Sequence, residues 1–308
     1  MIEERANLAG RVAVIVGGGG GIGGGVTRAL AQAGVDVAFC DIDEAAMAET
    51  EAAVSALGRG ALSHAADATA SDQLARFYAA VAARFERLDI CVNVVGGVDR
   101  RDFMAGTAAQ NAADIQRNYG YVIESVGHAV PLIRRGGRGG SIVNFTTIEA
   151  HRGAATFAVY AGAKAATTNF TRAVAVELAA EHIRCNCIAP DVTPSAGNWN
   201  ALRPEDKARI EALPPELGGS GVRFYVPMKE QPPVEALADA VLFLGSDMAR
   251  YITGTTLHVD GGTFAAAGFL DWPNGDGYVP APLGGTTAKL FADDGGAVPA
   301  SRPAGSIF

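Results

Sequence analysis

The chain has 308 residues, which permits one large domain or two modest ones, and its formal net charge is −8. This charge, without any basic stripe, argues against nucleic acid as a partner. No uninterrupted apolar run reaches the length that spans a membrane, and residues 1–5 are too polar for a secretion signal, so we expect a soluble, cytoplasmic protein.

A cluster of glycines follows the first expected strand. Residues 11–16 are apolar and β-branched, which is typical of a buried strand, and residues 26–32 favour a helix. Strand, glycine turn and helix in this order indicate a dinucleotide-binding loop, because a backbone without Cβ atoms can approach a pyrophosphate at a helix N-terminus. A merely flexible glycine-rich loop is the weaker alternative, since it does not account for the flanking strand and helix.

A carboxylate ends the second expected strand. The apolar run at residues 35–40 leads into Asp41, eighteen residues past Gly23. A carboxylate at this place can accept hydrogen bonds from the adenosine ribose hydroxyls and repels a 2′-phosphate. No Arg or Lys stands beside it in the sequence, so we predict NAD rather than NADP. Asp43 is a competing carboxylate, but we expect it to cap the helix at residues 44–56.

Strands and helices alternate along the rest of the chain. Further strands are expected at residues 61–63, 88–94, 141–146, 183–188 and 256–259. Further helices are expected at residues 73–85, 108–132, 156–181 and 234–244. The alternation predicts an α/β fold: a doubly wound, Rossmann-type parallel sheet of about seven strands with helices on both faces. The ligand of such a sheet binds outside the carboxyl ends of its strands.

The cysteines point to a reduced protein interior. All four fall in or near expected strands and show no C-x-x-C spacing: Cys40, Cys91, Cys185 and Cys187. We interpret them as reduced core residues of an intracellular protein. None of the five histidines stands at ligand spacing to the pair in the strand at 183–188, so no metal site is predicted.

One stretch carries a chemical signature. Tyr160 and Lys164 stand four residues apart in an expected helix, so their side chains lie on the same face, and Thr147 precedes the tyrosine by thirteen residues. A nearby cation favours the phenolate, which is a base that can take a proton from an alcohol. Lowering a phenol pKa from ~10 to neutrality requires about 4 kcal/mol. We expect this from a lysine beside a bound, cationic nicotinamide in a sheltered site.

Together these motifs resemble the short-chain dehydrogenase/reductase family, in its single-domain oxidoreductase branch, over roughly residues 8–262. The family's pattern T-G-x-x-x-G-I-G is matched with Val16 in place of threonine, at Gly17, Gly21, Ile22 and Gly23. The Y-x-x-x-K pair is intact, and the last expected strand is followed by the family's D-G-G ending at residues 260–262. Two other departures are Val94 in the N-N-A-G element and Asp191, which stands where the family has glycine.

The resemblance implies a cofactor site and an active site. Beyond the glycine loop and Asp41, the cofactor-binding positions it implies are Asp67, Ala68, Asn93, Gly96, Tyr160, Lys164, Pro190 and Thr193. The catalytic set it implies is Asn118, Thr147 in place of the family's serine, Tyr160 and Lys164.

The same resemblance implies a mechanism. Tyr160 takes the hydroxyl proton while hydride passes to nicotinamide C4, and Lys164 lowers the pKa of Tyr160 and holds the nicotinamide ribose. Thr147 hydrogen-bonds the substrate oxygen, and Asn118 supports a water-mediated proton path to Lys164.

Two segments interrupt the regular alternation. We expect a catalytic domain at residues 1–262, with a proline-rich substrate loop at 195–232, and a Gly/Pro-rich extension at 263–308. Candidate pocket walls in the loop are Asn198, Trp199, Phe224, Tyr225 and Met228. An ordinary surface insertion is the alternative interpretation of this loop. The extension is too apolar for a typical disordered tail, so we expect part of it to cover the substrate mouth or a neighbouring subunit: Phe264, Phe269, Trp272, Tyr278, Phe291 and Phe308.

The expected activity is the NAD-linked interconversion of a secondary alcohol and a ketone, with a bulky apolar substrate such as a steroid-like or alicyclic alcohol. A small sugar, or a 3-oxoacyl group on a carrier protein reduced with NADPH, is an alternative substrate. A non-catalytic dinucleotide-binding sensor or structural subunit is the alternative of another class. Glu149 and His151 are interpreted as solvated loop residues that could also touch substrate. The family resemblance further implies a homo-oligomer, a tetramer or a dimer, paired through the helices at 108–132 and 156–181.

Overall fold

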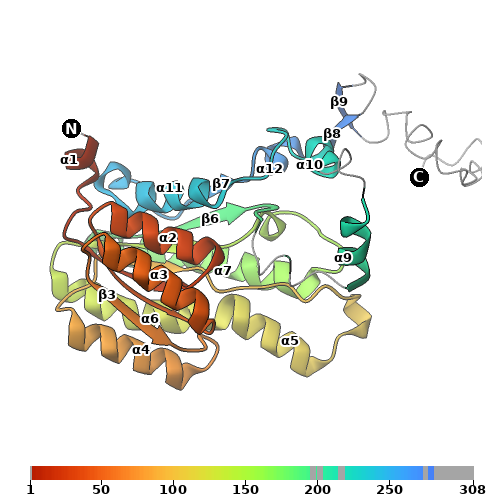
Figure 1. The fold of residues 1–308 in the computed structure, drawn as a ribbon. Coiled ribbons are helices and arrows are strands. Elements are labelled where there is room, and N and C mark those ends of the chain that lie inside the picture. The colour runs from red at the N-terminus through yellow and green to blue at the C-terminus, as the bar shows by residue number, and fades with distance from the viewer. Residues whose placement is uncertain (1, 195–198, 200–203, 214–218, 273–276, 281–308) are drawn as a thin grey trace, which may run out of the picture. The chain divides into compact units, whose positions relative to one another are not determined.

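The computed structural model describes residues 2–194, 199, 204–213, 219–272 and 277–280. Seven parallel strands form one sheet in the order β3-β2-β1-β4-β5-β6-β7 (Figure 1). The strands of this sheet are β1 (Val12–Val16), β2 (Asp36–Asp41), β3 (Ala61–Ala65), β4 (Ile90–Asn93), β5 (Gly140–Phe145), β6 (Ile183–Pro190) and β7 (Thr256–Val259). The predicted Rossmann-type fold is confirmed.

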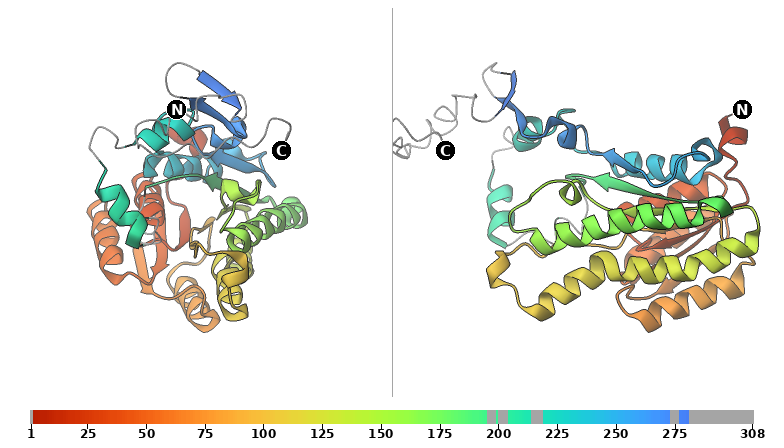
Figure 2. Two further views of the ribbon diagram at one scale, coloured as in Figure 1. Left: turned by 90° about the vertical axis from the view of Figure 1, so that its right-hand side faces the viewer. Right: turned by 180° about the vertical axis from the view of Figure 1, so that it is seen from behind.

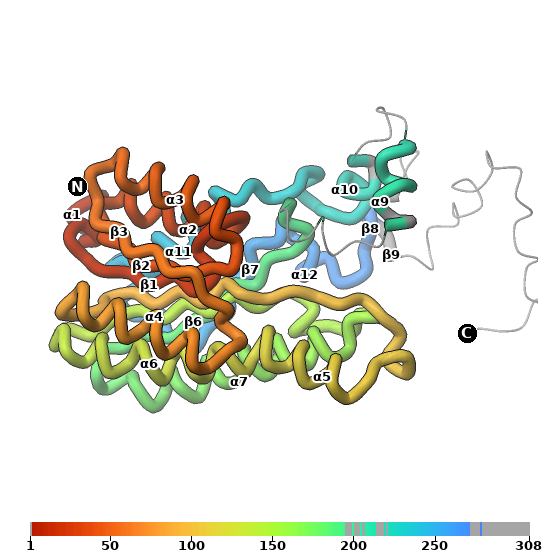
Figure 3. The backbone as a smooth tube through the Cα atoms, turned by 60° about the horizontal axis from the view of Figure 1, so that its bottom comes forward, coloured from red at the N-terminus to blue at the C-terminus, as the bar shows by residue number. Residues whose placement is uncertain are grey.

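Helices cover both faces of the sheet (Figures 2 and 3). One apolar cluster joins the sheet to α4 (Ser71–Arg84), α6 (Tyr121–Gly136) and α7 (Ala158–Leu178). The other joins it to α2 (Gly21–Gln32), α3 (Glu44–Ala56) and α11 (Val234–Gly245). Because both faces are covered, the central strand β1 is apolar along its length, and all five of its residues are buried. The other helices with defined bounds in the described residues are α1 (Ile2–Ala6), α5 (Ala108–Ile115), α9 (Pro204–Glu211), α10 (Ser220–Tyr225) and α12 (Thr263–Ala266).

The chain divides into two compact units. The larger comprises residues 1–212 and 232–260 and contains the whole seven-stranded sheet. The smaller comprises residues 213–231 and 261–308, and its described part holds α10, α12 and an antiparallel pair of strands, β8 (Phe269–Trp272) and β9 (Gly277–Pro280). The extension, expected to be irregular, therefore contains a helix and a pair of strands in its described part. Lys229, from residues 213–231 of the same unit, contacts Asp271 of β8 with its ammonium, which lies 4.6 Å from the ring centre of Tyr278.

Some residues named above as candidate pocket walls or covers lie outside the described residues, and others lie in the smaller unit. Phe291 and Phe308 lie outside the described residues, as does Asn198. Phe224 and Tyr225 lie on α10, in the smaller unit. Their roles as pocket walls remain predictions.

Most helices and strands lie close to where the sequence predicts them, but one expected helix is divided in two. The single helix expected at 108–132 is two helices, α5 and α6, joined by a π-helical segment at Gln116–Gly120. The π turn carries Asn118, whose backbone oxygen accepts a hydrogen bond from Thr167 of α7 at 2.9 Å. Gly120 gives the turn room, because a Cβ there would lie 2.0 Å from the Gln116 side-chain oxygen. Long-range contacts of this kind leave no periodic signal in the sequence.

The helix cap predicted at Asp43 is confirmed. Its carboxylate accepts a hydrogen bond from the Ala46 N–H at 3.0 Å, and α3 runs from Glu44 to Ala56 as expected. The four cysteines are free and buried. In the described part of the chain, no helix is both long and apolar enough to cross a bilayer.

Gly23 on α2 lies close against the glycine loop that follows β1. A Cβ at this position would lie 1.7 Å from the carbonyl oxygen of Gly17, which is backbone and cannot swing aside. We therefore expect Gly23→Ala to lower the free energy of unfolding by about 3 kcal/mol or to prevent folding, as overpacking does. Gly127→Ala is the matched control, because Gly127 is an exposed helical glycine whose added Cβ would meet nothing within 4 Å. Equal unfolding midpoints for the two variants in urea would contradict the assignment.

Candidate active site

The candidate site lies at the carboxyl ends of the strands, where the sheet order reverses between β1 and β4. The chain leaves β1 toward β2 on one side and reaches β4 on the other, so the connecting loops diverge, and ligands of open α/β sheets bind at such a point. The loops after β1, β4, β5 and β6 carry nearly all of the residues predicted for the cofactor and the reaction.

The glycine loop joins β1 to α2. Gly17 has a φ of +86° and Gly21 a φ of +51°, conformations that favour glycine. The N–H groups of Gly17 and Gly18 donate to the Cys40 carbonyl at 2.9 and 3.0 Å, which fixes the loop against β2. The residue before α2 is Gly20, which provides no side-chain cap, so the helix start suits an anion such as a pyrophosphate.

Asp41 braces this loop from the end of β2. One carboxylate oxygen accepts from the Gly19 N–H at 2.9 Å, and the other accepts from the Ile42 N–H at 2.8 Å and the Asp43 N–H at 3.2 Å. The carboxylate is therefore held at the tip of β2, beside the loop that would bind the pyrophosphate. Its position fits recognition of the adenosine ribose.

The loops after β3 and β4 carry the next predicted positions. The Asp67 carboxylate accepts from the N–H and hydroxyl of Thr69 at 2.8 and 2.7 Å, while Ala68 beside it is buried. The Asn93 amide faces the interior: it donates to Asn144 at 2.8 Å and accepts from Ser125 at 2.5 Å. The Asn93 side chain thus braces the sheet, leaving its backbone for any cofactor contact.

Gly96 creates the space in which two catalytic candidates meet. A Cβ on Gly96 would lie 2.8 Å from the Lys164 ammonium and 2.9 Å from the Asn118 side-chain oxygen. The Asn118 amide is buried and is tied to Gly97, accepting from its N–H at 3.1 Å and donating to its carbonyl at 2.9 Å. The two predicted residues and the loop after β4 therefore form one contiguous group.

Lys164 is buried on α7, with 3% of its surface exposed. Its ammonium donates to the Phe145 carbonyl at 2.9 Å and to the Val95 carbonyl at 3.5 Å. Burial lowers the pKa of Lys164 to about 8 because the charged form loses its hydration.

Thr147 and Tyr160 are brought together as predicted. Thr147 follows β5, Tyr160 lies in the first turn of α7, and the two side chains are hydrogen-bonded. Burial raises the pKa of Tyr160 to about 12, the Thr147 hydrogen bond opposes this rise, and the charges of Glu149 and Asp191 add to it. The protein by itself therefore keeps the phenol protonated, and a lower pKa would have to come from the positive charge of a bound oxidised nicotinamide.

Glu149 is the residue that the sequence interpretation assigned wrongly. Its carboxylate is not merely solvated: it accepts a hydrogen bond from the Thr147 hydroxyl, and its side chain is 12% exposed. The other oxygen pairs with Arg152 at 2.7 Å. His151 packs edge-on against His258, with ring centres 4.9 Å apart. A glutamate two residues after the hydroxyl residue is the only sequence signal, and its spacing alone did not reveal the contact.

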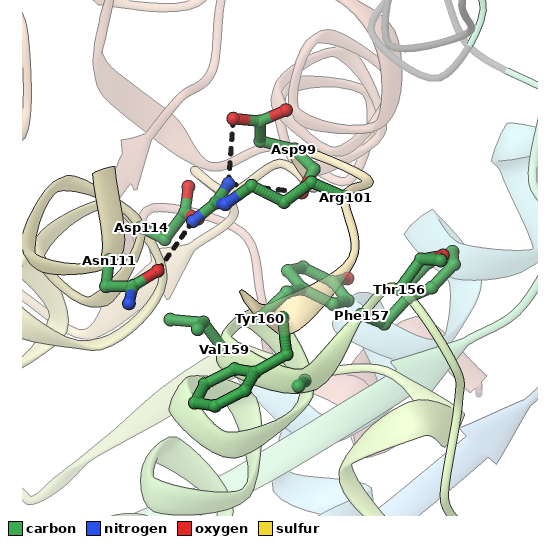
Figure 4. A pocket seen from close by; sticks show the side chains of 10 residues that line it. Asp99, Arg101, Asn111, Asp114, Thr156, Phe157, Val159 and Tyr160 are labelled. Atoms are coloured by element: carbon green, nitrogen blue, oxygen red, sulfur yellow. Dashed lines mark hydrogen bonds and ion pairs between the residues drawn. The ribbon is translucent and has the colours of Figure 1, made fainter. Parts of the chain in front are cut away.

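A small pocket opens beside Tyr160 (Figure 4). On one side Arg101 binds Asp114 at 2.6 Å, Asp99 at 2.7 Å and Asn111 at 2.9 Å. On the other side lie the start of α7 and the segment before it. The apolar and hydroxyl lining there is Thr156, Phe157, Ala158 and Val159, and Phe103, from the turn after Arg101, also lines the pocket. No motif pointed to the Arg101 cluster, because its members come from a loop and a helix that only the fold brings together.

The loop after β6 shows what Asp191 does in place of the family's glycine. Its side chain accepts from the Val192 N–H at 2.8 Å, and Val192 has a φ of +36°, which is uncommon for a β-branched residue. Thr193 is buried, and its hydroxyl donates to the Asp191 carbonyl at 3.3 Å. Pro190, at the end of β6, pairs with Val259 of β7. In the described ranges, no three His, Cys, Asp or Glu side chains gather as a metal site would need.

The fold and the clustered motif residues agree with comparisons to known proteins. A family model described as enoyl-(acyl carrier protein) reductase matches residues 17–263. A short chain dehydrogenase/reductase from Aspergillus oryzae is 31% identical, over 84% of this chain and 97% of its own length. The chain belongs to the short-chain dehydrogenase/reductase family.

Solved members of the family have the same fold. The carveol dehydrogenase of Mycobacterium avium, crystallised with NAD, is 29% identical with a TM-score of 0.76, over 83% of this chain and 98% of its own. Levodione reductase is 27% identical with a TM-score of 0.76, over 84% of this chain and 99% of its own. Solved relatives include complexes with NAD and with NADP. This chain is accordingly a nucleotide-binding oxidoreductase of the alcohol–ketone type.

The buried ammonium of Lys164 has a measurable effect on stability. Below pH 8 it is charged in both the folded and the unfolded chain, and burial of the charge opposes folding. Between pH 8 and 10.5 the folded state loses this proton first, so the penalty disappears as pH rises. The free energy of unfolding of the wild type, relative to Lys164→Met, should therefore rise by about 3 kcal/mol across this window. Urea denaturation from pH 7 to 11 measures the difference, and a constant gap would refute it.

Proposed function

We propose that this protein is an NAD-dependent dehydrogenase that interconverts a secondary alcohol and a ketone. The observation that carries the proposal is the convergence of four side chains at the carboxyl ends of β4 and β5: Tyr160, Thr147, Lys164 and Asn118. Tyr160 exchanges a proton with the substrate oxygen, and Thr147 hydrogen-bonds that oxygen. A bound nicotinamide supplies the hydride chemistry. A pure dinucleotide sensor would have no use for the buried lysine and the phenol–hydroxyl pair.

NAD is proposed over NADP on the position of Asp41. Its carboxylate is fixed at the tip of β2 beside Gly19 of the phosphate loop, where a 2′-phosphate would meet a negative charge. Gly17, Gly21, Ile22 and Gly23 would hold the pyrophosphate, and Lys164 the nicotinamide ribose. Asp67, Ala68, Gly96, Pro190 and Thr193 complete the proposed cofactor contacts.

For the substrate we propose a bulky alicyclic or steroid-like alcohol. The lining next to Tyr160 includes Phe103, Phe157 and Val159, which suit an apolar ring. Carveol dehydrogenase and levodione reductase, whose names refer to cyclic substrates, have the same fold. Reduction of a carrier-bound 3-oxoacyl group is the second candidate, since a 3-oxoacyl-[acyl-carrier-protein] reductase from Chlamydia trachomatis is 28% identical. A homo-oligomer in the cytoplasm is proposed with the function.

Removing the phenol hydroxyl tests the catalytic assignment. We expect Tyr160→Phe to bind NAD as the wild type does and to lose about 10³-fold in kcat with cyclic secondary alcohols, because the proton acceptor is gone. Tyr251→Phe is the matched control, since Tyr251 is fully exposed and should keep full activity. NAD affinity is measured by calorimetry and turnover by absorbance of the reduced cofactor. Unchanged turnover in Tyr160→Phe would overturn the proposal.

Neutralising the carboxylate at the tip of β2 tests the cofactor. In Asp41→Asn the repulsion of a 2′-phosphate is reduced, so the ratio of kcat/KM for NADP to that for NAD should rise at least tenfold. In Asp43→Ala only the cap of α3 is lost, which should cost about 1 kcal/mol of stability and leave the ratio unchanged. A wild type that already prefers NADP would contradict the assignment of NAD.

A further inference from the structure

The feature that carries a further inference is the hydroxyl group of Thr156, a residue that lines the pocket beside Tyr160 (Figure 4). Thr156 lies four residues before Tyr160, in the segment that leads into α7. Its carbonyl accepts a hydrogen bond from the Arg101 N–H at 3.3 Å, so the residue joins the two sides of the pocket. The hydroxyl oxygen is buried and has no hydrogen-bond partner among the described residues.

A buried hydroxyl group without a partner is costly, because it has lost its hydrogen bonds to water and gained none in exchange. The threonines within α7 avoid this cost: Thr167 and Thr168 each donate to the backbone carbonyl four residues earlier. Thr156 stands before the helix and has no such carbonyl below it. A polar group of a ligand in the pocket would remove the cost by pairing with the Thr156 hydroxyl.

The backbone of Thr156 is strained as well. Its φ is +67°, in the left-handed region that favours glycine and is an outlier for a β-branched residue. A glycine would adopt this φ without strain. Strained residues of this kind cluster at binding sites, where the surrounding contacts hold them. One pocket-lining residue thus combines an unpaired hydroxyl group with an unfavourable backbone conformation.

The other side of the pocket is polar, but its charges are already paired. Arg101 is the one cation among the described lining residues, and it binds Asp99 at 2.7 Å and Asp114 at 2.6 Å. A carboxylate on a substrate would therefore meet two carboxylates and an occupied guanidinium. A neutral hydroxyl or carbonyl group meets no such repulsion and can pair with Thr156.

We propose that Thr156 is a specificity-determining residue that hydrogen-bonds a second, neutral oxygen of the substrate. The substrate class is then a cyclic alcohol or ketone that carries a further hydroxyl or carbonyl group on its ring. A hydroxyl group both donates and accepts, so Thr156 fits either of these groups. This inference rests on the proposed alcohol–ketone chemistry at Tyr160 and extends it to the second functional group of the substrate.

Three variants test whether the hydroxyl group has a partner in the folded chain. Thr156→Val keeps the branched shape and the strained backbone but lacks the hydroxyl, whereas Thr156→Ser keeps the hydroxyl. Thr253→Val is the matched control, because the Thr253 hydroxyl accepts from the Cys185 N–H at 3.1 Å, at the amino ends of β6 and β7. In urea, Thr156→Val should unfold at the wild-type midpoint or above it, and Thr253→Val below it.

Cyclohexanol, three isomeric cyclohexanediols and a hydroxycyclohexanecarboxylate serve as matched substrates. In the wild type, kcat/KM for at least one diol should exceed that for cyclohexanol roughly tenfold or more, because a site with a buried hydroxyl group disfavours a substrate that leaves it unpaired. The ratio of the two kcat/KM values should fall toward one in Thr156→Val. It should keep its wild-type value in Thr253→Val and most of that value in Thr156→Ser.

The outcomes distinguish this inference from the proposed function. Turnover that Tyr160→Phe abolishes supports the function, whatever the variants at position 156 do. If that result holds and Thr156→Val keeps the wild-type ratio, or unfolds at a lower urea concentration than the wild type, the inference is overturned. A preference for the hydroxy acid also overturns it and would point instead to Arg100, whose guanidinium lies 5.2 Å from the ring centre of Phe157. If the wild type oxidises no cyclic alcohol and reduces no ketone with either cofactor, the function fails, and the inference fails with it.

Discussion

A buried ammonium group holds the site together. Lys164 on α7 donates to backbone carbonyls after β4 and at the end of β5, so one side chain ties a helix to two neighbouring strands at the edge where they end. A buried charge is costly unless it is hydrogen-bonded, and the lowered pKa of Lys164 reflects that cost. Gly96 leaves room for the ammonium, and Asn118 lies against the same space. Tyr160 owes its position to the helix that this contact fixes.

The electrostatic balance of the site opposes the base form of Tyr160. Burial and two nearby carboxylates raise the phenol pKa, while the cation best placed to lower it belongs to a bound, oxidised nicotinamide. The active base would thus form only when the cofactor is present. In this arrangement the protein holds Tyr160, Thr147 and Lys164 in place, and the positive charge of a bound cofactor would lower the pKa of Tyr160. Glu149, whose charge raises the phenol pKa, also accepts a hydrogen bond from the Thr147 hydroxyl.

Sequence patterns predicted the local parts of this structure well, because these depend on neighbouring residues. The strands, the glycine turn and the Asp43 cap follow from apolar runs, missing Cβ atoms and a carboxylate beside a helix start. The break in the helix expected at 108–132 was missed, because its cause is a set of contacts from Asn118 to Gly97 and Thr167. The inward turn of the Asn93 amide was missed for the same reason: its partners come from β5 and α6.

By itself, the sequence determined the order of strands and helices, the family, and the identity of Tyr160, Lys164, Thr147 and Asn118 as a candidate set. Periodicity, turn chemistry and short motifs are properties of adjacent residues, and they survive without coordinates. Only the tertiary structure decided which carboxylates face the phenol, how Arg101 is neutralised, and that Glu149 takes the Thr147 hydrogen. These facts depend on distances of a few ångströms between side chains that the fold brings together, and no spacing along the chain encodes them.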